Sequence, residues 1–213
     1  LETSNILLDD LFKHVVDQVE GLYSHWFLGE LGNNWSDVCA EELAEYGKIM
    51  EIPHQEDFYR SRVKNADSRV FVIISDAMRY EVAATLAEEL QRENQSQVKL
   101  QNMQSIFPSI TKFGMAALLP HSNLSVEVKN ELLSVLADGQ STASTNRDKV
   151  LKAANPASVA LQYKNIIGMK RADRSALVKG MEVVYIYHDT IDEAGAIPPI
   201  SLSFRLAKRQ FLS

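Results

Sequence analysis

The sequence of 213 residues has few of the residues on which several classes of protein depend. Its single cysteine, Cys39, cannot form a disulfide within the chain, and it excludes a cysteine-rich zinc site. No apolar stretch approaches the roughly 18 residues that a membrane-spanning helix needs. The longest tight apolar run, Val70–Ile74, has the length of a strand. No signal peptide is apparent at the N-terminus, so a reducing cytoplasm is the simplest setting.

A surplus of basic charge is also absent. Lys and Arg together number 22 against 28 Asp and Glu, which gives a net charge of −6. This charge balance disfavours a protein whose surface is basic overall and coats nucleic acid, although it does not exclude a local basic groove. Apolar residues make up 46% and charged residues 23% of the chain, as in globular proteins. The length fits one ordinary domain, alone or with a small appendage.

The spacing of apolar residues divides the chain into two regions with different patterns. Helical spacing dominates residues 1–50, and Gly32-Asn33-Asn34 is expected to separate a first helix from a shorter second one. Residues 57–68 carry no strong period and are interpreted as a connector. From Val70 onward strands alternate with helices, which predicts a parallel α/β sheet flanked by helices, with Val70–Ile74 buried on both faces. The other predicted strands are Val98–Met103, Val159–Tyr163 and Glu182–Tyr187, and the predicted helices are Ala77–Glu93, Thr111–Leu119, Val126–Leu136, Asp148–Ala154 and Arg174–Lys179.

The first candidate site follows the strand at Val70–Ile74. Ligands bind at the carboxyl ends of strands in open parallel sheets, and a glycine-rich turn there would indicate a dinucleotide. This chain has Asp76 instead, which suits a divalent cation placed between the acid and an anionic substrate. A helix cap is the simpler role for Asp76. Arg79 could meet a phosphate or form a surface ion pair, and Glu81 is expected to be a solvated helix residue.

A hydroxyl group at a helix start forms the second candidate. Thr111 lies two residues after the segment Phe107-Pro108-Ser109. A threonine Oγ near the free backbone N–H groups of a helix start could attack phosphorus. The alternative is that Ser109 or Thr111 only caps the helix.

The third candidate is a group of His188, Asp189, Asp192 and Glu193 where the strand Glu182–Tyr187 ends. These donors suit a Zn²⁺, Mn²⁺ or Mg²⁺ site, whereas a polar loop with a surface histidine is the plain alternative. All three candidates are expected at one edge of the sheet.

Three segments in this order resemble the PglZ domain, a member of the alkaline phosphatase superfamily that occurs in bacterial BREX phage-defence systems. They are Val70–Glu81, Pro108–Pro120 and Tyr187–Gly195, and the resemblance covers about residues 65–195. It implies an alkaline phosphatase-like α/β core with a site for two divalent metal ions, usually zinc, that acts on phosphoric esters. By this resemblance Asp76 and Asp192 are metal ligands, and Thr111 is both the nucleophile and a metal ligand. His188 and Asp189 match the family's sequence motif, but the resemblance assigns them no role.

The resemblance stops at Ala196, where the superfamily's Asp-x-x-x-His pattern would place a histidine, and no later Asp-His pair follows. The interpretation is therefore a helical segment at 1–64, a partial PglZ domain at 65–195 and a divergent tail at 196–213. We expect an incomplete, truncated or frame-shifted copy of a metal-dependent phosphatase or phosphodiesterase. A nucleic-acid or nucleotide phosphoester is one candidate substrate, and a phosphoprotein is another. The competing hypothesis is a non-catalytic assembly module that contacts other BREX proteins, such as the methyltransferase or an ATPase, and an unrelated α/β binding domain is a third.

Overall fold

A computed structural model describes residues 2–93 and 97–195 of the chain. Two compact units are present, Leu1–Ile52 and Pro53–Ser213, and each is described here by itself. The predicted divergent tail at 196–213 lies outside the described residues.

Most of the N-terminal unit is one uninterrupted helix, which contains a short π-helical stretch between two α-helical parts. It comprises α1 (Glu2–Gly21), a π-helical stretch η1 (Leu22–Phe27) and α2 (Leu28–Tyr46). The expected break at Gly32-Asn33-Asn34 is wrong, because glycine or asparagine inside a helix costs only about 1 kcal/mol or less and does not stop it. The side-chain amide of Asn34 donates to the backbone carbonyl of Glu30 at 2.7 Å, so this side chain bonds to its own helix. Gly47 ends the helix instead, with a left-handed φ of 67°.

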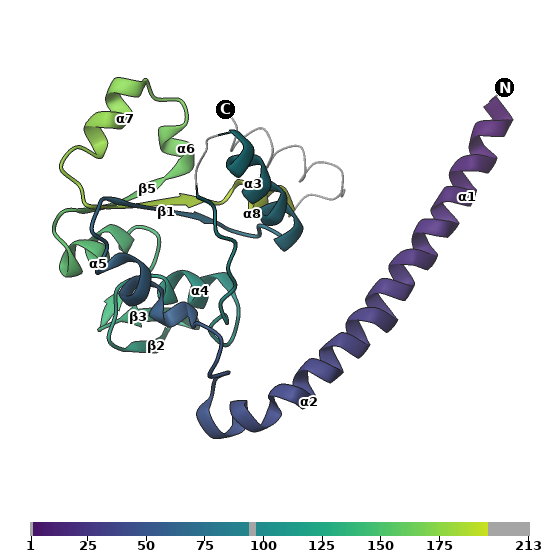
Figure 1. Cartoon of the computed structure of the whole chain (residues 1–213), viewed down its shortest axis with the longest axis horizontal. Helices are drawn as coiled ribbons and strands as arrows, with labels where there is room; N and C mark the ends of the chain where they lie inside the picture. The colour runs from purple at the N-terminus through teal and green to yellow at the C-terminus, as the bar shows by residue number, and fades with distance from the viewer. Residues whose placement is uncertain (1, 94–96, 196–213) are drawn as a thin grey trace. The chain divides into compact units, whose positions relative to one another are not determined.

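The C-terminal unit is built on a parallel sheet in the strand order β1-β6-β5. Its strands are β1 (Val70–Ser75), β6 (Val183–His188) and β5 (Ser158–Gln162). Val70 pairs with Val183 and Ser75 with His188, so β1 and β6 run side by side along their whole length. The predicted parallel α/β sheet is confirmed. Figure 1 shows α4, α5 and the β2–β3 hairpin below this sheet, with α6 and α7 above it.

The hydrophobic core lies on one face of the sheet. Val72, Tyr185 and Tyr187 contribute from the strands, and Leu119 and Leu151 pack against them from the helical layer. The opposite face of β1 is open among the described residues, because Phe71 is 52% and Ile73 is 56% exposed. The expectation that Val70–Ile74 is buried on both faces is therefore wrong. Alternation in β1 separates one buried set of side chains from one exposed set.

A small antiparallel sheet replaces the helix expected at Val126–Leu136. It consists of β2 (Leu124–Lys129), β3 (Leu132–Ala137) and β4 (Gln140–Ser141). Asn130 and Glu131 connect β2 to β3, and both have positive φ, 50° and 62°. Positive φ at both central residues matches the right-handed twist of a two-residue hairpin, so this turn fixes the register.

Short helices complete the unit. Segment 57–68, interpreted as a connector, contains helical turns that bury Tyr59 and Val63, and the strand expected at Val98–Met103 has no regular structure. The helices are η2 (Gln55–Asp57), η3 (Tyr59–Val63), α3 (Tyr80–Glu93), α4 (Thr111–Ala117), α5 (Arg147–Ala154), α6 (Tyr163–Ile166), α7 (Arg171–Leu177) and α8 (Thr190–Gly195). Within the described ranges, no helix combines the length with the apolar character needed to cross a bilayer.

Candidate active site at the carboxyl ends of β1 and β6

The carboxyl ends of β1 and β6 lie next to each other and place Asp76 at the edge of the sheet. The backbone N–H of Asp76 donates to the carbonyl of His188 at 2.9 Å, which extends the pairing one residue beyond the strands. Asp76 Oδ1 accepts the N–H of Ala77 at 3.0 Å, and Ala77 has a left-handed φ of 58°. The helix α3 begins only at Tyr80, so this turn directs the carboxyl group away from any cap of α3.

Three predicted site residues from distant parts of the chain meet at Asp76. The Thr111 hydroxyl donates a hydrogen bond to its carboxyl group, and Asp192, in the first turn of α8, is near enough to interact with it electrostatically. Partial burial, followed by repulsion from Asp192, raises the pKa of Asp76, although the hydrogen bonds and Arg147 act in the opposite direction. The site therefore concentrates negative charge that a bound cation would relieve.

Thr111 is the first residue of α4, and Ile110 occupies the cap position before it. Its hydroxyl is therefore engaged with Asp76 rather than with the start of its own helix. A cavity of about 300 Å³, here called the Thr111 cavity, is lined by Asp76, Ser109 and Thr111 among others. Gln55 fixes its wall, since its amide donates to the Gly114 carbonyl at 3.2 Å and accepts the Ile106 N–H at 3.1 Å.

Arg147 is a member of this site that the sequence pattern did not reveal. Its guanidinium lies over the ring of Tyr187 at 4.4 Å, and its Nε donates to the Thr142 carbonyl at 3.3 Å. Burial lowers the pKa of Arg147, and interactions with Tyr187 and Asp76 partly offset that effect. The hydroxyl of Tyr187 is buried and has no hydrogen-bond partner in the described part of the chain. A positive charge thus interacts with the Asp76 carboxylate.

The other predicted site residues point elsewhere. His188 is 2% exposed, its Nδ1 is 3.0 Å from the Ser75 hydroxyl, and its ring contacts Tyr163 edge-on. Asp189 forms an ion pair with Lys164 at 3.1 Å. Arg79 pairs with Glu81 at 2.6 Å on the surface. These contacts engage the side chains of His188, Asp189 and Arg79 with partners other than Asp76, Thr111 and Asp192.

The donor set decides which metal centre the described residues fit. Asp76, Asp192 and Thr111 offer two carboxylates and one hydroxyl, which suit one hard divalent cation with water or substrate in its remaining positions. Within residues 2–93 and 97–195, no cluster of three or more His, Cys, Asp or Glu could hold a metal ion. The two-zinc set that the resemblance implies is thus only partly present in the described chain.

A parallel sheet with acids and a hydroxyl at its carboxyl edge defines an alkaline phosphatase-like α/β protein. The BREX system PglZ alkaline phosphatase-like domain matches residues 57–197, more than half of the chain. The chain therefore belongs to the PglZ family, as its sequence motifs indicated.

Two relatives have similar sequences. The alkaline phosphatase-like protein BrxZ of Escherichia coli O9:H4 (strain HS) is 40% identical over 192 residues, and the alkaline phosphatase-like protein PglZ of Bacillus cereus (strain H3081.97) is 37% identical over 189 residues. Each alignment covers 87% of this chain and 22% of the relative. The chain therefore spans about a fifth of the length of these relatives. No solved structure matches the chain.

Proposed function

We propose that this chain carries part of the active site of a metal-dependent phosphoric-ester hydrolase, with Thr111 as the nucleophile. The observation that supports the proposal most is that Thr111 and Asp76 line one cavity close enough to interact, with a second carboxylate from Asp192 acting on Asp76. The cavity next to Thr111 leaves room for a phosphoryl group. The substrate we propose is a phosphomonoester or phosphodiester of a nucleotide or nucleic acid.

Each residue has a defined task in this reaction. Asp76 orients Thr111 Oγ, which attacks phosphorus; a P–O bond to Oγ forms, the bond to the ester oxygen breaks, and the proton lost by Oγ passes through solvent to the leaving oxygen. Water then hydrolyses the bond between Oγ and phosphorus and returns a proton to Oγ, which releases phosphate from a monoester or a phosphomonoester from a diester. Asp76 and Asp192 would hold the cation, whose positive charge would lower the pKa of the hydroxyl. Arg147 is placed to bind a non-bridging phosphoryl oxygen, because a guanidinium offers several N–H donors.

Turnover of a chromogenic phosphodiester in the presence of Zn²⁺, Mn²⁺ or Mg²⁺ tests this proposal. Thr111→Ala should abolish turnover by the full chain, because it removes the attacking oxygen. Thr85→Ala is the matched control, since that hydroxyl only bonds to the Glu81 carbonyl within α3. Equal turnover by both variants would remove Thr111 from the mechanism.

A second proposal is an assembly role, in which the N-terminal helix contacts other BREX proteins such as the methyltransferase. The apolar side chains of this helix favour it: Val19 is 59%, Leu22 is 62% and Trp26 is 64% exposed. An apolar helical face of this kind is normally covered by a partner. Co-purification with the BREX proteins should decrease when Leu22 and Trp26 are both replaced by Ser. Recovery of no BREX protein with the unmodified chain would contradict this role.

A further inference from the structure

A second cavity, of about 600 Å³, lies beyond the C-terminal end of α4. Leu119, Pro120 and His121, which follow this helix, form part of its wall. It is called the Lys64 cavity here. It shares no lining residue with the Thr111 cavity, which lies at the beginning of the same helix. A volume of several hundred Å³ is typical of small-molecule sites, and inorganic phosphate alone would leave most of it empty.

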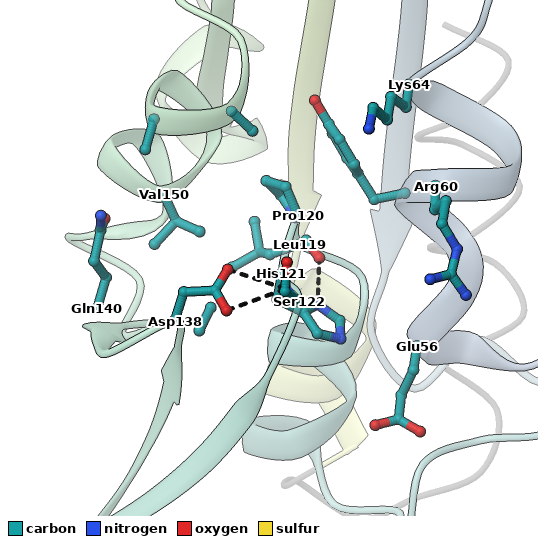
Figure 2. Close-up of a pocket in the computed structure, with 14 residues that line it drawn as sticks. Glu56, Arg60, Lys64, Leu119, Pro120, His121, Ser122, Asp138, Gln140 and Val150 are labelled. Carbon is teal, nitrogen blue, oxygen red and sulfur yellow. Dashed lines mark hydrogen bonds between the residues drawn. The ribbon is translucent and has the colours of Figure 1, made fainter.

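Positive charge gathers on one wall of the Lys64 cavity. Figure 2 shows Lys64 and Arg60 together on this wall, with the Glu56 carboxylate directed away from Lys64. Lys64 makes no ion pair with the described residues, whereas Arg60 pairs with Asp57. His121 Nδ1 donates to the Leu119 carbonyl at 2.7 Å, which leaves Nε2 of the neutral ring as an acceptor, so Lys64 and Arg60 are the donors of this wall. This wall suits an anion.

Hydrogen-bond acceptors stand on the opposite wall. Asp138 comes from the turn between β3 and β4, and Gln140 is the first residue of β4; both lie across the cavity from Arg60 (Figure 2). The Asp138 carboxylate accepts the backbone N–H groups of Ser122 at 3.0 Å and Asn123 at 2.8 Å, which fix its position. The Gln140 side chain adds an amide oxygen. Together these oxygens suit a ligand that presents N–H donors.

Tightly packed apolar side chains form the floor between the two walls. Leu119 is fully buried and Val150 and Ala137 are 4% and 2% exposed, so the apolar surface that a ligand can reach lies mainly at the exposed Ala153 and Ala154. A flat ring can therefore lie between an anion-binding wall and an acceptor-bearing wall.

From this division of charge we infer that the Lys64 cavity binds a nucleoside monophosphate whose base carries an amino group. The phosphate lies at Lys64 and Arg60, the base contacts the apolar lining, and its amino group donates to Asp138 and Gln140. The inference is independent of the proposed hydrolase, because the two cavities have separate linings.

Isothermal titration of the full chain with AMP tests the inference. AMP should bind at least tenfold more tightly than adenosine, inorganic phosphate or IMP, because each of these lacks at least one of the recognised groups. Lys64→Glu should weaken AMP binding at least tenfold, and Gln140→Leu should reduce the preference for AMP over IMP. Lys179→Glu makes the same charge change at an exposed position outside both cavities and should have no effect.

Three results would overturn the inference. They are no binding of AMP, equal losses in Lys64→Glu and Lys179→Glu, and loss of AMP binding in Asp76→Asn with none in Lys64→Glu. The last would place the nucleotide in the Thr111 cavity. Circular dichroism of each variant identifies any that fails to fold, and Gln140→Leu then carries the test in place of Lys64→Glu.

Discussion

Tyr185 connects the centre of the sheet to the helix that carries Thr111. Its side chain is fully buried, and its hydroxyl donates a 2.8 Å hydrogen bond to the carbonyl of Leu118, the residue that caps the end of α4. Tyr185→Phe keeps the ring and removes only this donor. The substitution therefore isolates one bond between β6 and α4.

The free energy of unfolding should fall by about 1–3 kcal/mol in Tyr185→Phe, because the carbonyl of Leu118 loses its donor inside the protein. For a chain of this size, each kcal/mol lowers the Tm by about 2–4 °C, so the Tm should fall by roughly 2–12 °C. Differential scanning calorimetry measures the shift. Tyr80→Phe is the control, since Tyr80 is 73% exposed. Equal Tm values for the two variants would show that the bond does not stabilise the fold.

Three further predictions concern the hairpin, the buried tyrosines and the site. Glu131→Gly should raise the free energy of unfolding by about 0.5–1 kcal/mol in urea titrations, because glycine adopts the φ of 62° without strain; a loss of stability would contradict this. Burial raises the pKa of Tyr185 and Tyr187 above the ordinary 10.0, so the unfolded chain releases these protons first and stability should fall as the pH rises above about 10. If the tyrosinate absorbance of the folded protein developed fully near pH 10, the predicted rise in the pKa of these two tyrosines would be refuted. Arg147→Met should raise the inhibition constant for inorganic phosphate at least tenfold in the phosphodiester assay, and an unchanged constant would exclude phosphate binding by Arg147.

The parallel strand pair was predictable because β-branched residues concentrate in two short runs. Val70–Ile74 and Glu182–Tyr187 both became strands, and the acids that follow them meet where the strands end. The hairpin at Leu124–Ala137 was missed because its apolar residues also match helical spacing. Its strand alternation, together with the polar pair Asn130-Glu131, was the signal that could have identified it.

The membership of the site was harder to predict than its position. His188 and Asp192 are close in sequence, yet His188 still belongs to β6 and faces away from Tyr187, whereas Asp192 follows the turn into α8 and approaches Asp76. Alternation along a strand separates such neighbours. Arg147 gave no signal, because its proximity to Tyr187 arises only when α5 packs on the sheet.

Binding of a divalent cation between Asp76 and Asp192 is the central claim, and isothermal titration with Zn²⁺, Mn²⁺ and Mg²⁺ measures it most directly. One cation should bind per chain at these residues, and binding should be lost in both Asp76→Asn and Asp192→Asn. Asp173→Asn, an exposed acid in α7, should bind as the unmodified chain does. Cation binding that persists in Asp76→Asn and Asp192→Asn, or that is absent from the unmodified chain, would contradict the account.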